Sequence, residues 1–115
     1  MMIHGIGIDL VEVGRFKAAM ERRGRRFLKR LFTESEILYC MRRKNPETHF
    51  AARFAAKVSL FKAIGRWGRF TDVEIVRAPS GRPVVKAEGV DGLRFSVSIS
   101  HDGNLSVAQT IAEEI

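Results

Sequence analysis

The feature that most constrains this chain is one long apolar helix near its middle. The stretch RFAAKVSLFKAIG, residues 53–65, places Phe54, Val58 and Phe61 at the spacing of one helical face. An asparagine followed by a proline precedes the stretch, as is usual where a helix begins. We therefore predict a helix over roughly residues 47–67, around which the rest of a small protein has to pack.

This helix also carries charge of one sign only. Arg53, Lys57 and Lys62 lie within residues 53–65, and the stretch holds no carboxylate. Cations on so apolar a helix need a negative partner from elsewhere, because an unpaired buried charge is costly. The helix alone does not say what that partner is.

Before this helix, the pattern predicts one strand and two shorter helices. Residues 3–10 alternate and then become apolar, and their glycines imply that another backbone approaches closely. A short basic helix is predicted over residues 13–22, broken at Gly24. In FTESEILYCMRR, Thr33 is followed three residues later by a glutamate, which is a capping box, and the helix it opens is predicted to have a basic last turn.

After the long helix, the periodicity changes to that of strands. DVEIVRA alternates, PSGRP predicts a turn, and RFSVSIS places its apolar residues on one face and its serines on the other. The Asp-Gly pair of HDGN favours a tight hairpin with LSVAQTIA as the returning strand. Helices followed by mostly antiparallel strands predict an α+β fold.

Length and composition bound the function. The chain has 115 residues, which suits a single domain over residues 1–115. No run approaches the roughly 20 apolar residues needed to span a bilayer, and no export signal is visible. Cys40 is the only cysteine, so no internal disulfide can form, and we interpret it as a packed thiol. We expect a soluble cytoplasmic protein.

The positive charge is concentrated in the first part of the chain. Lysine and arginine number 20 against 13 aspartates and glutamates, a net charge of +7. Such a surface attracts nucleic acid, a phosphorylated small molecule or an acidic protein, or it is a solvated face without a partner. The main cluster consists of Arg15, Lys17, Arg22, Arg23, Arg25, Arg26, Lys29 and Arg30, and a second cluster follows at Arg42, Arg43 and Lys44.

Two residues could carry chemistry, and each has a plainer interpretation. Asp9 ends an apolar strand, where it could cap a turn or bind a metal. His101 ends an alternating strand before a hairpin, where it could be a general base, a substrate contact or a surface histidine. His4 and His49 have no partner pattern, and no zinc spacing is present.

Taken together, these segments resemble the holo-acyl-carrier-protein synthases, which are small bacterial phosphopantetheinyl transferases. The resemblance runs through GIGIDLVEVGRF, LFTESEILYC, RFAAKVSLFKAIG, SGRPVV and VSISHDGNLSVA, in the family's order. It implies a phosphopantetheinyl-transferase-like fold, with a long central helix packed on a mostly antiparallel sheet. It also implies Mg²⁺-dependent transfer of the phosphopantetheine arm of coenzyme A to a serine of acyl carrier protein in fatty acid biosynthesis.

The resemblance also implies roles for individual residues. Asp9 matches a metal ligand, and Lys62 and His101 match the other catalytic positions. The basic positions of the long helix match phosphate contacts, and Phe54 and Gly65 match the coenzyme groove. The implied coenzyme-binding set is Arg53, Phe54, Lys57, Lys62, Gly65, Ser80, Gly81, Arg82, Pro83 and His101.

The chain departs from the family at Val58. The family has a glutamate there, as its second metal ligand, one helical turn from the position of Lys62. Magnesium can be held by one protein carboxylate together with phosphate oxygens and water, so we expect weaker metal binding. Loss of catalysis in this homologue, or an artificial substitution at residue 58, would equally account for the valine, and we favour retained activity.

The resemblance further implies two protein contacts. The acidic carrier protein would dock on the basic helix through Arg15 and residues 22–26, and three copies of the chain would share active sites between neighbours. The alternatives are a non-catalytic homologue that binds coenzyme A or carrier protein, and a nucleic-acid-binding module, which lacks a supporting motif. We expect neither nucleic acid nor a membrane as partner.

Overall fold

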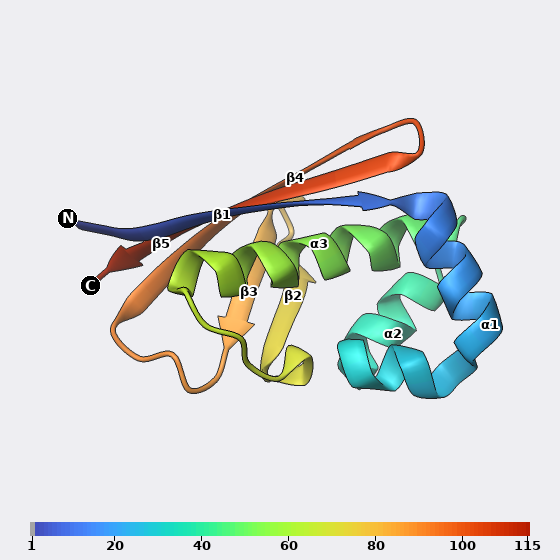
Figure 1. The fold of residues 1–115 in the computed structure, drawn as a ribbon, viewed down its shortest axis with the longest axis horizontal. Coiled ribbons are helices and arrows are strands. Elements are labelled where there is room, and N and C mark those ends of the chain that lie inside the picture. The colour runs from blue at the N-terminus through green and yellow to red at the C-terminus, as the bar shows by residue number, and fades with distance from the viewer. Residues whose placement is uncertain (1) are drawn as a thin grey trace.

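Helix α3 (Pro46–Ile64) runs through the middle of the molecule, and the other elements pack around it (Figure 1). The structure is a computed structural model and describes residues 2–115. The described elements, in chain order, are β1 (Met2–Glu12), α1 (Val13–Leu31), α2 (Glu34–Met41), α3, a short 3-10 helix η1 (Phe70–Asp72), β2 (Val73–Arg77), β3 (Pro83–Ala87), β4 (Leu93–Asp102) and β5 (Leu105–Glu114).

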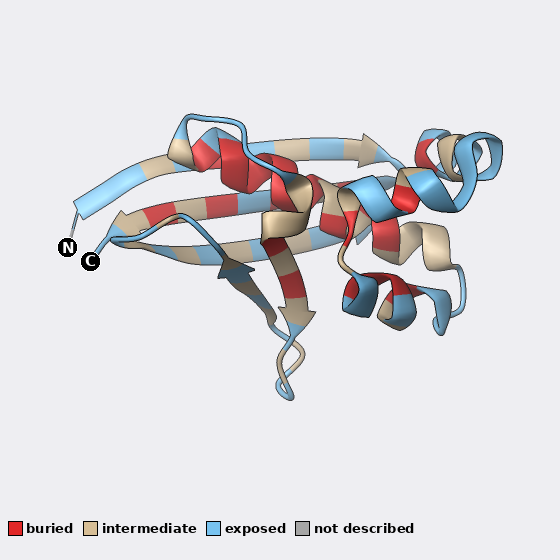
Figure 2. Cartoon of the chain, turned by 90° about the horizontal axis from the view of Figure 1, so that it is seen from below, coloured by how far each residue is buried: buried red, intermediate tan, exposed pale blue. Residues whose placement is uncertain are grey.

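The strands form a three-stranded antiparallel sheet of order β1-β5-β4 and a separate antiparallel β2-β3 ribbon. Helix α3 covers one face of the larger sheet, and Figure 2 shows buried residues concentrated on α3 and on β5, the middle strand. The other face of β1 carries the exposed side chains of Ile6, Ile8 and Leu10. The predicted α+β class is confirmed.

The predicted close approach at the glycines of β1 is a contact with α3. A Cβ atom on Gly5 would collide with the carbonyl oxygen of Ala63, and one on Gly7 would collide with that of Ser59. Both obstacles are backbone atoms of the helix, so a side chain could not be accommodated by a rotamer change. The two glycines therefore allow the strand to lie directly on α3.

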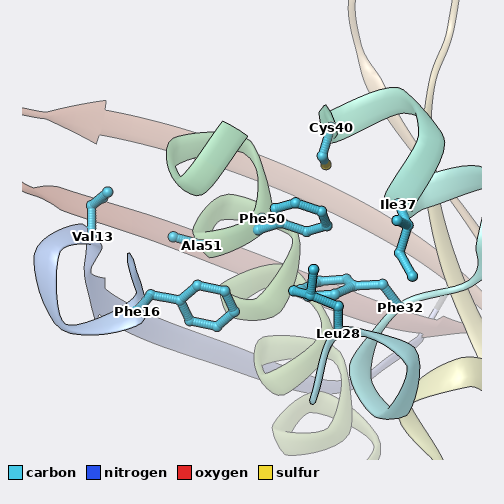
Figure 3. Close-up of a cluster of buried hydrophobic side chains, with 8 residues drawn as sticks. All are labelled: Val13, Phe16, Leu28, Phe32, Ile37, Cys40, Phe50 and Ala51. Atoms are coloured by element: carbon cyan, nitrogen blue, oxygen red, sulfur yellow. The ribbon is translucent and has the colours of Figure 1, made fainter. Parts of the chain in front are cut away.

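Two apolar clusters hold α3 in place. One joins it to α1 and α2, and Figure 3 shows Phe16, Phe32 and Phe50 packed at its centre beside the Cys40 thiol. The other fills the space between α3, the larger sheet and the β2-β3 ribbon. Cys40 is fully buried, and burial raises the pKa of its thiol to about 11, so the interpretation as a packed thiol is confirmed.

Several boundaries differ from the predicted ones. The predicted break at Gly24 is confirmed, because its φ of 73° is left-handed and not helical, but a second helical segment follows it and extends α1 to Leu31. The capping box at Thr33 is confirmed, whereas α2 ends at Met41, before the arginines expected in its last turn. Helix α3 ends at Ile64 because Gly65 adopts a left-handed C-cap, with φ 82°.

Within residues 2–115, no helix is both long enough and apolar enough to cross a membrane.

Candidate functional site

Asp9 and Lys62, both predicted to be catalytic, lie together where β1 crosses α3. The Lys62 Nζ is 3.6 Å from the Asp9 Oδ1 and donates a hydrogen bond to the carbonyl oxygen of Ile8 at 2.9 Å. Partial burial raises the pKa of the Asp9 carboxyl, and the neighbouring Lys62 ammonium opposes that rise. The arrangement holds one positive charge beside one carboxylate within β1, which does not end near Asp9 as predicted but continues to Glu12.

Val58 lies on α3 one turn before Lys62 and is almost completely buried. Its side chain offers no oxygen ligand. Among the described residues, no group of three or more histidine, cysteine, aspartate or glutamate side chains could hold a metal ion. Asp9 is therefore a candidate for a metal ligand only together with oxygen atoms supplied by a bound ligand.

Asp9 opens onto a cavity of about 770 Å³ between β1, α1 and α3. Phe54, predicted to line a coenzyme groove, forms part of its wall, where its ring is stacked on that of Phe70 with centroids 5.6 Å apart. Arg15 and Arg22 of α1 also line the cavity. A carboxylate, apolar walls and two arginines at one cavity suit a ligand with an anionic and an apolar part.

Lys57 was predicted to contact phosphate, and the structure contradicts this. Its side chain is fully buried, and its Nζ donates to Glu36 Oε1 at 2.7 Å and to the carbonyl oxygens of Leu31 and Phe70 at 2.8 and 3.0 Å. An ammonium group has three donors, and all three are used within the chain. Lys57 is thus not free to bind a ligand phosphate.

The acid that pairs with Lys57 is itself held from several sides. Glu36 Oε1 accepts from the backbone nitrogen of Thr33, and Glu36 Oε2 accepts from that of Ile75 at 2.8 Å. Burial lowers the pKa of Lys57, and the Glu36 carboxylate beside it opposes that change. The buried pair joins α3 to the end of α1, the start of α2, η1 and β2.

Arg53 is also buried, but in a different environment. Its guanidinium lies 4.4 Å from the ring centroid of Tyr39, and the guanidinium of Arg43 lies 4.0 Å from the same ring. Among residues 2–115, its Nε has no hydrogen-bond partner, although only 5% of the residue is exposed. Unlike Lys57, Arg53 thus has a buried donor without an acceptor in the described part of the chain, so it stays a candidate for binding an anion.

The predicted nucleotide loop forms the turn between β2 and β3. Two backbone hydrogen bonds close it, from Ala78 N to the Arg82 oxygen and from Gly81 N to the Ala78 oxygen. The guanidinium of Arg77 donates to the Gly81 oxygen at 3.0 Å. A hollow of about 340 Å³ beside the turn is lined by residues that include Ser80, Arg82 and Pro83.

His101 does not join Asp9 within one chain. It lies on β4, where it is paired with Ser106 of β5, and Ser106 is in turn paired with Val11 of β1. Strand β5 thus separates His101 from the strand that carries Asp9, and His101 is exposed. A role for His101 in the site of Asp9 stays a prediction that needs a second chain.

The arginines predicted to dock a partner point in different directions around α1. Arg15 and Arg22 line the cavity of Asp9. Arg23 and Arg26 border a small separate hollow, and Arg25 lines a groove between α1 and α2. Only the first two are therefore near the candidate catalytic residues.

Comparison with known proteins identifies the class to which this fold and site belong. A sequence model of the 4'-phosphopantetheinyl transferase superfamily matches residues 5–110, and the chain belongs to this superfamily. A curated relative, the holo-[acyl-carrier-protein] synthase of Koribacter versatilis, is 42% identical, with 98% of this chain and 100% of the relative covered.

Solved structures agree with this assignment. A holo-(acyl-carrier-protein) synthase from Bacillus anthracis, in complex with CoA (3',5'-ADP), superposes with a TM-score of 0.90 at 30% identity, with both chains fully covered. The Neisseria meningitidis holo-[acyl-carrier-protein] synthase has a TM-score of 0.91 at 30% identity, covering 98% of this chain and 100% of that chain.

Sequence reasoning missed the surroundings of Arg53. Tyr39 was not assigned a role, Arg43 was predicted only as part of a basic surface cluster, and His49 was interpreted as an ordinary histidine. The ring centroid of His49 nevertheless lies 6.3 Å from that of Tyr39. One signal was present, since His49 and Arg53 are four residues apart and share a helical face. Their meeting with Tyr39 depends on how α2 packs against α3.

Proposed function

We propose that this chain is a holo-acyl-carrier-protein synthase that transfers the phosphopantetheine arm of coenzyme A to a serine of apo acyl carrier protein. Membership of the transferase superfamily and the names of the relatives support this activity. The observation that carries the proposal is the Asp9–Lys62 pair beside a cavity lined by Phe54, Arg15 and Arg22. Fatty acid biosynthesis is the proposed pathway.

The proposed reaction is a phosphoryl transfer. The serine oxygen forms a bond to the phosphorus that carries the pantetheine arm, the pyrophosphate P–O bond breaks, and adenosine 3',5'-bisphosphate leaves. The serine proton passes to a base, for which the candidates are a water molecule, His101 and a carboxylate. The ammonium of Lys62 would stabilise negative charge that develops on the phosphates.

Magnesium is part of this proposal. Asp9 would hold it together with phosphate oxygens of the bound coenzyme, and the ion would neutralise charge on the leaving group. Because Val58 adds no oxygen and the Lys62 ammonium lies 3.6 Å from the Asp9 carboxylate, we expect low affinity for the metal before coenzyme A binds.

Coenzyme A would be held by Arg53 and the Ser80–Pro83 turn at its phosphates and nucleotide, and by Phe54 along its arm. The B. anthracis and Helicobacter pylori holo-[acyl-carrier-protein] synthases, solved in complex with CoA (3',5'-ADP) and with coenzyme A, support coenzyme A as the substrate. Gly65, which ends α3, would let the backbone approach the arm closely.

The carrier protein would dock on the first half of α1. Arg15 and Arg22 are exposed and line the cavity of Asp9, so an acidic protein bound there could bring its serine to Asp9 and Lys62. The residues Arg23, Arg25 and Arg26 would contribute long-range attraction only, since they face other sides of the helix.

We also propose a homotrimer. The exposed face of the larger sheet carries Ile6, Ile8 and Leu10, each more than half exposed, and such a row of large apolar residues is unusual on an isolated protein surface. A neighbouring chain would cover part of this area and place its His101 near Asp9. Light scattering that reports a monomer at working concentration would contradict this assembly.

The test of the function is mass spectrometry of apo acyl carrier protein after incubation with this chain, coenzyme A and a magnesium series. Transfer adds the mass of phosphopantetheine to the carrier. No product at saturating magnesium would reject the activity for this chain and favour a non-catalytic homologue. If only the Val58→Glu variant formed product, the valine at residue 58 would be the cause of the lost activity.

A further inference from the structure

Positive groups from two parts of the chain gather around Tyr39. His49 and Arg53 come from α3, and Arg43 comes from the connection between α2 and α3. Arg53, Arg43 and, to a smaller extent, Arg77 of β2 lower the pKa of His49, and Glu47 opposes them. The cluster therefore has more positive charge than its own acid can neutralise.

Within this cluster, the burial of Arg53 favours an anionic ligand. Its guanidinium and that of Arg43 lie against one ring, although like charges repel each other at short range. The Arg53 Nε is buried and unpaired. An anion at this guanidinium would supply the missing acceptor and opposite charge, and a phosphate group does so with several oxygens.

His49 belongs to the same cluster by its geometry. It lies one helical turn from Arg53 on α3, and its ring stands nearly perpendicular to that of Tyr39, at 77°. Its side chain is half-buried, so a ligand can reach it. Imidazole is the group in this cluster whose charge changes near neutral pH.

We propose that His49 is an additional contact in the phosphate site formed by Arg43 and Arg53, and that it binds the phosphate as an imidazolium. A proton is then taken up from solution as the ligand binds. The natural ligand in this inference is the phosphorylated nucleotide of coenzyme A, which rests on the proposed function. The evidence for the His49 contact itself is the arrangement of positive groups around Tyr39, which does not depend on the proposed function.

The direction of the effect follows from the charges. In the free protein, burial lowers the pKa of His49, and Arg53, Arg43 and Arg77 lower it further. A bound anion favours the charged form and raises this pKa. Anion affinity is then highest below the free-state pKa, falls as pH rises through the bound-state pKa, and is constant above it. If the rise is about one unit, the affinity falls about tenfold.

Sulfate is the best probe, because a phosphate monoester itself titrates near pH 6 and sulfate does not. The experiment follows the imidazole signals of all three histidines by NMR across pH, with and without saturating sulfate. We expect sulfate to raise the pKa of His49 by about one unit. The proposal is overturned if sulfate leaves His49 unchanged or shifts His4 equally.

Three variants make the assignment specific. His49→Gln is expected to remove the pH dependence of sulfate affinity, whereas His4→Gln, which changes a histidine of β1, is expected to keep it. Arg43→Gln removes one exposed cation, and we expect it to weaken sulfate binding and to reduce the shift of His49. An unchanged pH dependence in His49→Gln would also overturn the proposal.

Coenzyme A separates this inference from the proposed function. If the chain transfers phosphopantetheine but its affinity for coenzyme A has the same pH dependence in His49→Gln, the inference fails and the function stands. If sulfate shifts His49 but no transfer occurs at any magnesium concentration, the anion site stands and the function fails.

Discussion

Lys57 and Lys62 lie five residues apart on α3, and the structure gives them opposite environments. Lys57 is fully buried, with its three donors taken by Glu36, Leu31 and Phe70. The Lys62 side chain is 48% exposed, and its Nζ lies 3.6 Å from the Oδ1 of Asp9 on β1. One lysine holds elements together, and the other remains available to a ligand.

The difference shows that a cation on an apolar helix can serve either of two purposes. It can be the partner of a buried carboxylate, or it can be available to bind a negative ligand. Which applies depends on whether its donors are already satisfied, because an ammonium with three good acceptors has no capacity left. Arg53 is the intermediate case, buried like Lys57 and lacking an acceptor.

The largest predicted effect is a loss of stability, and it differs between substitutions at the two lysines. Lys57→Met leaves the buried Glu36 carboxylate without its partner, and we expect the free energy of unfolding to fall by about 3–5 kcal/mol. Lys62→Met removes a partly exposed pair and is expected to cost no more than about 1 kcal/mol. Urea unfolding at equal protein concentration measures both, and equal losses would contradict the assignment of Lys57.

A second variant tests the surroundings of Lys62. Val58→Glu adds a carboxylate one turn from Lys62, and we expect the free protein to bind Mn²⁺ about tenfold more tightly or better. Electron paramagnetic resonance of bound Mn²⁺ measures this without turnover. Val58→Gln has a similar shape and no charge, so an equal gain in that variant would argue against a metal position beside Asp9.

The carrier surface gives a smaller, kinetic effect. Arg15→Glu reverses a charge at the cavity of Asp9, and we expect the KM for carrier protein to rise several-fold while the KM for coenzyme A stays nearly constant. Arg25→Glu is the matched reversal on another side of α1 and should have the weaker effect. An equal rise in the KM for carrier protein in both variants would indicate that only the net charge of the protein matters.

The smallest predicted effect is a pH-dependent change in stability at Glu74, which lies close to the buried pair of Lys57 and Glu36. The hydroxyl groups of Ser35 and Thr33 donate to Glu74 and lower the pKa of its carboxyl. Its contribution to stability is therefore present above the unfolded-state pKa and is lost as pH falls through the folded-state pKa. We expect a difference between native protein and Glu74→Gln of about 1 kcal/mol or less near neutral pH, vanishing in acid. A difference that is constant with pH would contradict this.

Much of the fold could be predicted locally. The capping box at Thr33, the helix break at Gly24 and the alternation of β4 each depend on a few neighbouring residues. The second helical segment after Gly24 was not predicted, and its apolar residues, Leu28 among them, pack into the core. A single glycine interrupts the helical backbone, but the residues after it can still pack into the core.

The sequence by itself determined the α+β class and the apolar central helix, and its resemblance to a known family implied that Asp9 and Lys62 belong to one site. Periodicity and caps are local, so they can be read along the chain. Only the tertiary structure decided that Lys57 is bound by Glu36 and that Arg43, His49 and Arg53 gather around Tyr39. These partners come from separate elements, and the way those elements pack, which no local pattern specifies, brings their charges together.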